Sequence, residues 1–386
     1  MAIKILYFIE GTGGGAVTHV LNLAKYMLNG MIQPLVIFFL DGPSVKRAED
    51  LGLNYKLIPW KFSLDPTLIW RLWKTISEEK IDIVHSHTIT GNFYARIAAL
   101  LCPRSLISVT TVHSLIIDEL RGSPRISFKD RLRYLREKCT WGVVDHFITV
   151  SEAIKSRMLQ SGIPERKITV VNNGVELPDL SWRVTHEKFL KKELNAEDGE
   201  IIISIIGRLV PVKNHRLFLN AAKSVLEKSP KAKFLVVGDG PLLHTLKEET
   251  RKLGISKAVM FTGWLHDVQK ILSVTDIYVI CSTVEGLNIS VLEAMANGKP
   301  VVGTAVRGIS DIVLDNKTGT LVPPNDVDAL ARAILNLVEN KELRRSMGLM
   351  GRRTVERKYS IQKMTEETVE VYSKLFYRSR GSLHAE

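Results

Sequence analysis

Cysteine is scarce in this chain of 386 residues, and its three cysteines, Cys102, Cys139 and Cys281, stand far apart. An odd number at such spacing suits neither a disulfide framework nor a metal knuckle, and it points to the cytoplasm. Long apolar runs are also missing, because none approaches the roughly 18 residues of a membrane span. The apolar N-terminal stretch is too short for a signal peptide and runs into a glycine turn, so we interpret it as a buried strand.

The chain has no low-complexity tract and no short repeat. Its 45% apolar and 24% charged residues are ordinary for a soluble globular protein, and its length suits about two domains. The formal charge of +12 predicts an anionic partner, which could be phosphate ligands, an anionic membrane surface or nucleic acid. Nucleic acid is not expected, because no helix-turn-helix, aromatic RNA platform or zinc module accompanies the charge.

Short β-branched runs alternate with amphipathic stretches, which is typical of parallel sheets covered on both faces. Leu68, Leu72 and Ile76, for example, recur at the spacing of a helix face. We expect helices at 153–160 (capped by Ser151), 290–297, 326–339, 341–357 and 361–377. We expect strands at 4–9, 35–40, 55–58, 81–85, 106–111, 146–150, 168–171, 201–206, 234–237, 259–261, 277–281, 301–302 and 320–322.

The alternation is lost over residues 176–199, which contain Pro178 and many charged residues. We therefore expect two doubly wound α/β domains in tandem, residues 1–180 and 200–358, joined by a linker at 181–199. Ligands of such sheets bind beyond the carboxyl ends of the strands.

The stretch from Asp276 to Asp311 contains a short strand, a glycine turn and a helix, and Glu285 and Glu293 bracket the turn. The N–H groups and dipole at a helix start suit a phosphate, while carboxylates accept hydrogen bonds from sugar hydroxyls. The stretch thus favours a ligand with a phosphate and a polyol. Alternatively, Ser290 and Glu293 form a capping box, and Glu293 caps its own helix.

Two cations follow the first strand of the second domain, in the segment from Gly207 to Lys213. Arg208 can bind two phosphate oxygens and Lys213 adds a point charge, so together they could neutralise a diphosphate. The alternative is two solvated surface cations. At another strand end, the turn Gly238-Asp239-Gly240-Pro241 is expected to line the ligand with its backbone.

Histidines follow two strands of the first domain: His85 and His87 end one, and His113 follows another. Several histidines at one sheet edge indicate a polar cleft, although His85 or His87 alone could be a surface residue without a role. No metal is expected here, because no carboxylate or cysteine accompanies them at ligand spacing. Nor is one expected at Asp326-Val327-Asp328, because acidic residues are ordinary in the first turn of a helix.

The first glycine loop matches a dinucleotide fingerprint, G-x-G-x-x-A, through Gly11, Gly13 and Ala16. Asp41, which ends the next strand, lies further on than the usual offset of about 20 residues. Glycine turns also occur wherever a phosphate needs close backbone approach. A nicotinamide or flavin oxidoreductase therefore stays a remote alternative.

The segment from Arg121 to Lys138 has seven basic residues against two acidic ones, and Leu132 and Leu135 interleave with them. One interpretation is a solvated helix face with its apolar side on the core. The other is a patch for anionic lipid headgroups or for an anionic acceptor.

Taken in order, these motifs resemble the retaining glycosyltransferases of family 4, whose GT-B architecture has two Rossmann-like domains facing each other across a cleft. The likeness covers nearly the whole chain, and Glu285 and Glu293 match the family's E-x7-E motif. The other matching segments are Gly13-Gly14-Gly15 with His19 and Asn22-Leu23-Ala24, His85-Ser86-His87, Thr149-Val150-Ser151-Glu152, Asn172-Asn173-Gly174-Val175, Gly207-Arg208 with Lys213, and Gly238-Asp239-Gly240-Pro241.

The resemblance implies a role for each matching residue. Arg208 and Lys213 would hold the donor diphosphate. Glu293 would bind the ribose, and Glu285 the C3 and C4 hydroxyls of the transferred sugar. His113 would lie near the C6 hydroxyl and the anomeric centre. The remaining donor-binding residues are expected to be Gly14, Gly15, Gly238, Gly286, Leu287, Asn288 and Ile289.

One departure concerns the turn E-G-L-N-I-S, where many members of the family have a second glycine or a proline. This turn resembles members that use UDP-sugars more than the G-F-G type often linked with GDP-mannose. Donor identity is therefore expected to be decided around Asn288.

The resemblance implies a metal-independent hexosyltransferase that retains anomeric configuration, takes a UDP-sugar as substrate and needs no cofactor. Its acceptor would be a glycan or a lipid-linked sugar of cell-envelope polysaccharide biosynthesis. It would work in the cytoplasm, peripherally at the inner face of the membrane, with the helix 361–377 crossing back to the first domain. The alternatives are a nucleotide-sugar epimerase or hydrolase of the same fold, or a non-catalytic nucleotide-sugar-binding protein.

Overall fold

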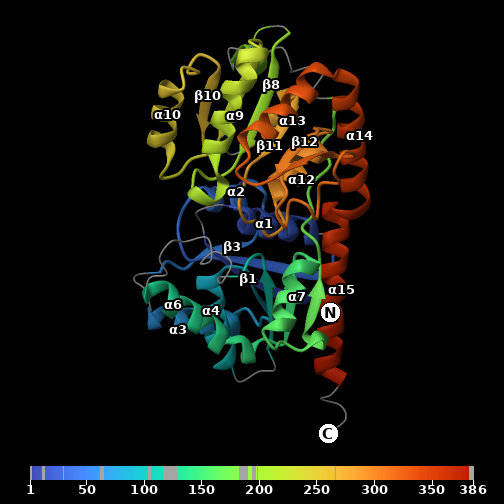
Figure 1. The fold of residues 1–386 in the computed structure, drawn as a ribbon. Helices are drawn as coiled ribbons and strands as arrows, with labels where there is room; N and C mark the ends of the chain where they lie inside the picture. The colour runs from blue at the N-terminus through green and yellow to red at the C-terminus, as the bar shows by residue number, and fades with distance from the viewer. Residues whose placement is uncertain are drawn as a thin grey trace. The chain divides into compact units, whose positions relative to one another are not determined.

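Two parallel sheets organise the chain, one in each of two compact units (Figure 1). The computed structural model describes residues 2–10, 14–28, 30–60, 65–102, 106–115, 128–181, 190–193, 197, 199–265 and 267–381, without the side chains of 129 and 130. The first unit comprises Met1–Gly174 and Ile361–Glu386, and the second comprises Val175–Ser360.

The first unit has a seven-stranded sheet of order β3-β2-β1-β4-β5-β6-β7. Its strands are β1 (Ile3–Ile9), β2 (Ile32–Phe38), β3 (Tyr55–Leu57), β4 (Ile83–Ser86), β5 (Ile107–Val112), β6 (His146–Thr149) and β7 (Ile168–Val170). Its helices are α1 (Gly15–Met27), α2 (Pro43–Asp50), α3 (Pro66–Glu78), α4 (Ile89–Leu100), α6 (Phe128–Cys139), α7 (Glu152–Gln160) and α15 (Ile361–Gly381).

The second unit has a six-stranded sheet of order β10-β9-β8-β11-β12-β13. Its strands are β8 (Ile201–Ile206), β9 (Ala232–Val237), β10 (Val259–Gly263), β11 (Ile277–Ile280), β12 (Val301–Thr304) and β13 (Gly319–Val322). Its helices are α9 (His215–Lys228), α10 (Leu243–Lys252), α11 (Gln269–Val274), α12 (Ile289–Ala296), α13 (Val327–Glu339) and α14 (Lys341–Lys358), with a short 3-10 turn at Pro211–Lys213.

Strand β1 shows how the sequence produces these layers. Successive side chains point to opposite faces of a strand. Ile5 and Tyr7 accordingly pack in a core with residues of α1 and α15, whereas Leu6 and Phe8 pack in a second core with residues of α3 and α4. The part of the strand that is buried on both faces, residues 5–9, is accordingly an uninterrupted run of apolar and aromatic residues, whereas Lys4 is half-buried.

All thirteen expected strands are present, within a few residues of the predicted bounds, and the α/β prediction is confirmed. The helix capped by Ser151 is also confirmed, because the hydroxyl of Ser151 accepts a hydrogen bond from the N–H of Ile154. The positions of strands and helices could be predicted from apolar periodicity because both strand faces and one helix face are buried.

Helix α15, at the end of the chain, belongs to the first unit and contributes Val371, Tyr372 and Phe376 to its core. The hydroxyl of Tyr372 lies 3.0 Å from that of Tyr7 and hydrogen-bonds Nδ1 of His85. Both tyrosines are buried, so these contacts satisfy polar groups that would otherwise be costly inside the core.

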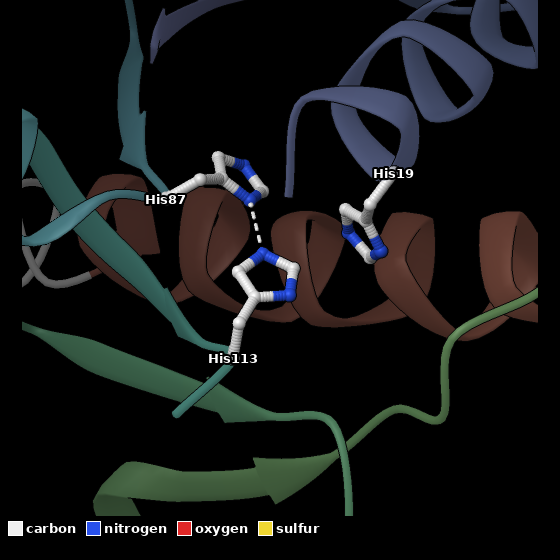
Figure 2. Close-up of side chains that lie close together, drawn as sticks. All are labelled: His19, His87 and His113. Carbon is white, nitrogen blue, oxygen red and sulfur yellow. Dashed lines mark hydrogen bonds between the residues drawn. The ribbon is translucent and has the colours of Figure 1, made fainter. Parts of the chain in front are cut away.

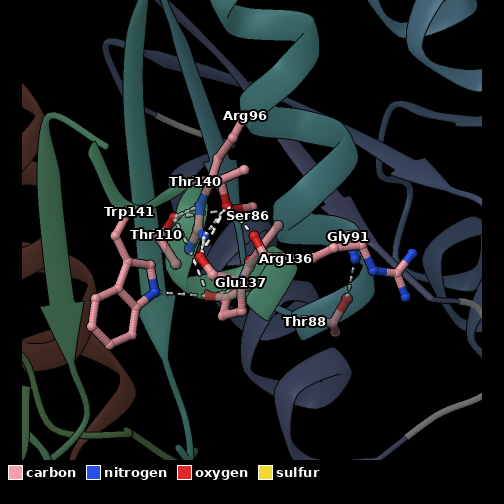
Figure 3. Close-up of polar contacts among 10 residues, drawn as sticks. Ser86, Thr88, Gly91, Arg96, Thr110, Arg136, Glu137, Thr140 and Trp141 are labelled. Carbon is pink, nitrogen blue, oxygen red and sulfur yellow. Dashed lines mark hydrogen bonds and ion pairs between the residues drawn. The ribbon is translucent and has the colours of Figure 1, made fainter. Parts of the chain in front are cut away.

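A buried ion pair joins α4 to α6 in the same unit (Figure 3). The guanidinium of Arg96, which is fully buried, donates to Oε1 of Glu137 at 2.9 Å and to Oγ1 of Thr140 at 2.9 Å. Oε1 of Glu137 also accepts a hydrogen bond from Nδ2 of Asn92 at 3.1 Å. A buried charge is tolerated because it is paired and hydrogen-bonded in this way.

Residues 121–127 of the basic segment lie outside the described residues. On α6, Phe128, Leu132 and Leu135 are exposed, with fractional exposures of 80%, 38% and 56%. The interpretation in which the leucines pack on the core is therefore wrong, because α6 buries Glu137 instead. No helix among the described residues is long and apolar enough to cross a membrane.

Candidate active site

The site in the second unit lies where the strand order reverses. Strand β8 has β9 on one side and β11 on the other, so the chain leaves β8 and β11 in opposite directions at their carboxyl ends. Such a switch point is where open parallel sheets bind ligands. The loop from Gly207 to Lys213 follows β8, and the loop from Cys281 to Asn288 follows β11.

Close backbone contact holds the loops after β8 and β9 together. Gly238 has φ of +134°, and a Cβ atom placed on it would lie 2.1 Å from the carbonyl oxygen of Gly207. The N–H of Gly207 donates to the carbonyl of Val237, and that of Leu209 to the carbonyl of Asp239, both at 2.9 Å. The glycine is therefore required by a close approach that positions the loop carrying Arg208, which is exposed.

The loops after β8 and β11 are joined next to the two charges predicted from the sequence. The N–H of Thr283 donates to the carbonyl of Val212 at 2.9 Å. One residue and two residues further along, Lys213 and Glu285 form an ion pair between Nζ and Oε1. Their side chains are only 21% and 11% exposed, so Lys213 is not a solvated surface cation.

Helix α12 begins one residue earlier than predicted, and its cap differs from the expected one. Asn288 is the N-cap, and its Oδ1 accepts hydrogen bonds from the N–H of Val291 at 3.1 Å and from Oγ of Ser290 at 2.7 Å. The capping box of Ser290 and Glu293 is therefore wrong. An amide at the N-cap position accepts the same N–H bond as a serine, so the sequence pattern alone does not place the helix start.

Ser290 has a different role from the one predicted. Its hydroxyl lies 2.7 Å from the hydroxyl of Tyr278 and 3.3 Å from the carbonyl oxygen of Ile206, which ends β8. Burial raises the pKa of Tyr278, and the carboxylates Glu285 and Glu293 raise it further. Both carboxylates thus oppose ionisation of the same buried phenol.

The remaining predicted residues of this unit surround the same turn. Asn288 and Leu287 are buried, whereas Gly286, Ile289 and Glu293 are half-buried. Gly308, with φ of +83°, packs against the turn: a Cβ atom there would lie 1.9 Å from the carbonyl oxygen of Gly286. Gly308 was not predicted from the sequence, because a glycine does not indicate which backbone segment it packs against.

Three histidines of the first unit lie together (Figure 2): His87 and His113 follow β4 and β5, and His19 comes from α1; His19 and His87 are buried and His113 is half-buried. Nδ1 of His87 lies 3.3 Å from Nε2 of His113, and His19 of α1 completes the group. Burial lowers the pKa of all three, to about 4 for His19, so each is a neutral imidazole at pH 7. Part of the sequence prediction, a polar cluster at this edge, is confirmed.

The suggestion that His85 or His87 is an idle surface residue is wrong. Their fractional exposures are 0% and 3%, and the ring of His85 contacts Tyr372 of α15 while that of His87 contacts His19 of α1. His85 bridges Tyr372 and Oγ1 of Thr111, the latter at 2.8 Å, and therefore has both ring nitrogens hydrogen-bonded.

His19 and Asn173 contact each other, and from the sequence each was identified only as part of a motif. Nδ1 of His19 lies 2.9 Å from Oδ1 of Asn173, which follows β7. The amide oxygen can only accept, so Nδ1 of His19 carries the proton and Nε2 has the lone pair. This contact could have been predicted from the position of Asn173, which follows a strand of the same sheet.

The first glycine loop is described from Gly14, the N-cap of α1, which has φ of +107° and no side chain to cap the helix. Gly11 and Gly13 of the dinucleotide fingerprint lie outside the described residues. The carboxylate of Asp41 makes a local hydrogen bond, because its Oδ1 accepts from the N–H of Gly42 at 2.7 Å. Helix α1 therefore begins at Gly15 with no side-chain hydrogen bond at its N-cap.

The Asp326-Val327-Asp328 segment is a helix start. Oδ1 of Asp326 accepts a hydrogen bond from the N–H of Ala329 at 2.8 Å and so caps α13. The structural interpretation of this D-x-D pattern is therefore the right one for Asp326.

Family models account for nearly the whole chain. The model described as Glycosyltransferase Family 4 matches residues 13–178, and that described as Glycosyl transferases group 1 matches residues 186–354. The chain is 30% identical over 281 residues to the UDP-Gal:alpha-D-GlcNAc-diphosphoundecaprenol alpha-1,3-galactosyltransferase of Escherichia coli, covering 70% of each protein. It is 32% identical over 307 residues to the putative glycosyltransferase EpsD of Bacillus subtilis (strain 168), covering 78% of this chain and 79% of that one.

Solved structures share the fold over almost the full length. The structure of Anabaena HepE in complex with UDP-glucose has a TM-score of 0.83 at 20% identity, covering 96% of this chain and all of the other. A sucrose-phosphate synthase from Thermosynechococcus elongatus has a TM-score of 0.79 at 18% identity, covering 97% of this chain and 100% of that one.

Proposed function

Because the chain belongs to glycosyltransferase family 4 and has the GT-B fold, we propose that it transfers a hexosyl group from a UDP-sugar to a glycan or lipid-linked acceptor with retention of configuration. That it is a glycosyltransferase follows from the family. The observation that carries the site assignment is the Lys213–Glu285 ion pair at the switch point of the second sheet, beside the start of α12.

The second unit binds the donor in this proposal. Arg208 and Lys213 neutralise the diphosphate, and the N–H groups of Ile289 and Ser290, in the first turn of α12, donate to its oxygens. Asn288 already occupies the N–H of Val291, so its contribution is to hold the turn in shape. Glu293 accepts from the ribose hydroxyls and Glu285 from the C3 and C4 hydroxyls of the sugar, while Gly238 and Gly286 let the backbone approach.

The first unit provides Gly14, Gly15 and His113. The N–H groups at the start of α1 face the donor phosphate or the acceptor. His113 contacts the C6 hydroxyl of the sugar near the anomeric carbon. Its neutral imidazole offers one donor and one acceptor, which suits a hydroxyl group.

In the transfer step, the bond between the anomeric carbon and the diphosphate oxygen breaks while the acceptor oxygen bonds to the same face of that carbon. The acceptor hydroxyl passes its proton to the departing phosphate oxygen. The charge that develops on the leaving group is stabilised by Arg208, Lys213 and the N-terminus of α12. These groups replace a divalent metal, so we propose that the reaction is metal-independent.

Relatives support a donor of the UDP type and an envelope acceptor. The Escherichia coli relative is named for UDP-Gal and for a diphosphoundecaprenol-linked GlcNAc. A Staphylococcus aureus relative, 28% identical, is named as a capsular polysaccharide biosynthesis enzyme. We therefore propose that the acceptor is a sugar on a diphosphate-linked lipid or a growing envelope polysaccharide.

The exposed face of α6 supports a peripheral position at the cytoplasmic face of the membrane. Phe128, Leu132 and Leu135 are exposed beside Arg131 and Lys138. Apolar side chains among cations are the composition of helices that lie on anionic lipid surfaces. Flotation of the protein with anionic liposomes at low salt would show binding, and Leu132→Ser with Leu135→Ser would abolish it.

A donor panel tests the function. The purified protein is incubated with UDP-hexoses and GDP-mannose, with and without a diphosphate-lipid-linked acceptor, and nucleoside diphosphate release is measured in the presence of EDTA. We expect UDP to be released from a UDP-hexose only when the acceptor is present. NMR of the product should show that the anomeric configuration of the sugar is unchanged. Acceptor-independent release would indicate a hydrolase, and binding without release a nucleotide-sugar-binding protein.

A further inference from the structure

We propose that His19, His87 and His113 form a binding site for one borderline-soft divalent cation of the Zn²⁺ type. One ligand nitrogen from each residue can be chosen so that all lie within 4.8 Å of one another, and the three side chains converge from α1 and the ends of β4 and β5 (Figure 2). All three belong to the first unit. Imidazole nitrogen is a preferred ligand of Zn²⁺.

The spacing of the two strand-borne histidines matches tetrahedral coordination. Two nitrogens bound at 2.0–2.1 Å in a tetrahedral site lie about 3.3–3.4 Å apart. Nδ1 of His87 and Nε2 of His113 are 3.3 Å apart before any cation binds. In the absence of a cation the same distance accommodates a single hydrogen bond, so one proton occupies the place that the cation would take.

The tautomer of the third histidine is fixed by a hydrogen bond. Asn173 accepts the proton on Nδ1 of His19 at 2.9 Å, which leaves the lone pair on Nε2. Polar groups that fix a histidine tautomer in this way are the usual outer partners of metal ligands. No metal was expected from the sequence because no carboxylate or cysteine accompanies the histidines, but a set of three imidazoles needs neither.

A neutral imidazole has a lone pair on one ring nitrogen and a proton on the other. Each ring would bind through one nitrogen and keep its proton on the other, so the proton count does not change. Three protein ligands leave a fourth position open, which a water molecule would fill.

Occupancy would inhibit transfer, a consequence that rests on the proposed function of His113. A cation on Nε2 of His113 takes that nitrogen away from the sugar hydroxyl. The cation is thus a regulator or inhibitor of this chain and not a participant in the reaction, which is proposed to need no metal.

Titration of the tag-free, metal-stripped full chain with Co²⁺ and Zn²⁺, without donor or acceptor, tests the site. One equivalent of Co²⁺ with the visible spectrum of a tetrahedral complex is expected, and Zn²⁺ should displace it. His19→Ala and His87→Ala should each weaken binding at least tenfold, and Asn173→Ala by about 10- to 100-fold. His244→Ala, which removes an exposed histidine, is the matched control and should bind as the wild type does.

The outcomes separate the two proposals. Absence of a saturable one-to-one complex, or loss of binding in His244→Ala but not in His19→Ala, overturns the metal site and leaves the transferase proposal intact. Circular dichroism of the variants excludes misfolding as the cause of lost binding, and Asn173→Ala gives a second test that keeps all three ligands. If Zn²⁺ binds at the site but does not slow transfer, the site holds and the role of His113 in the transfer reaction is wrong.

Discussion

Lys213 and Glu285, 72 positions apart in the chain, form a largely buried ion pair between the loops that leave β8 and β11. The pair brings together a cation suited to a diphosphate and a carboxylate suited to a sugar. Without a ligand each charge satisfies the other, so donor binding has to exchange this ion pair for contacts to phosphate and hydroxyl groups.

Substitution of either partner should reduce turnover, each for a different reason. We expect Lys213→Ala to reduce kcat by at least 100-fold, because the leaving diphosphate loses a cation. We expect Glu285→Gln to lower kcat/KM for the sugar nucleotide by a larger factor than it lowers the affinity for free UDP. Steady-state kinetics and UDP calorimetry measure both effects. Lys223→Ala, on α9 of the same unit, is the control. Wild-type turnover in Lys213→Ala would refute the assignment.

A Cβ atom at Gly308 should disturb the donor turn. Gly308→Ala would place that atom 1.9 Å from the carbonyl oxygen of Gly286 and 2.7 Å from that of Glu285, so the turn must move. We expect at least tenfold weaker UDP binding by calorimetry. Gly254→Ala is the matched control, because its φ of +74° imposes similar backbone strain with no atom within 4 Å. Equal UDP affinities for the two variants would contradict this prediction.

The buried pair Arg96–Glu137 should be sensitive to the loss of one partner. We expect Glu137→Ala to lower the free energy of unfolding by about 3–5 kcal/mol, because it leaves the guanidinium of Arg96 buried without its counterion. Urea unfolding followed by circular dichroism measures this. The double variant Arg96→Met with Glu137→Leu should be closer to the wild type, since neither charge remains. A larger loss in the double variant than in Glu137→Ala would show that the charges themselves are needed.

His215, the first residue of α9, should make the second unit less stable in acid. Its fractional exposure is 1%, and burial, with the nearby charge of Lys213, lowers its pKa from 6.5 to about 4. Between these values the unfolded chain binds a proton that the folded chain does not, so stability falls as the pH falls from 7 towards 4.

Replacement of His215 removes this proton linkage. We expect the wild type to lose about 1–2 kcal/mol more than His215→Leu between pH 7 and pH 5, where urea unfolding measures the difference. Neither ring nitrogen of His215 has a hydrogen-bond partner among the described residues, so the variant leaves no buried group unpaired. Parallel stability curves for the two proteins would count against this prediction.

Much of the site could be predicted from the sequence because it lies at strand ends. Strand ends were identifiable from apolar runs, and parallel strands bring their carboxyl ends to one edge, so Arg208, Lys213 and Glu285 were expected close together within their own sheet. The same argument placed His87 with His113. The hydrogen-bond and ion-pair partners of each side chain could not be predicted from the sequence, because several neighbouring groups could have served as the partner.

The sequence by itself determined the strands, the α/β layers and the charged residues at strand ends, because periodicity reports which face each residue buries. Only the tertiary structure decided that Asn288 and not Ser290 caps α12, since the hydroxyl of Ser290 bonds to Tyr278, twelve residues away. It likewise decided that the leucines of α6 face solvent while Glu137 is buried against Arg96. These outcomes depend on contacts between segments distant in the chain, which a local pattern does not contain.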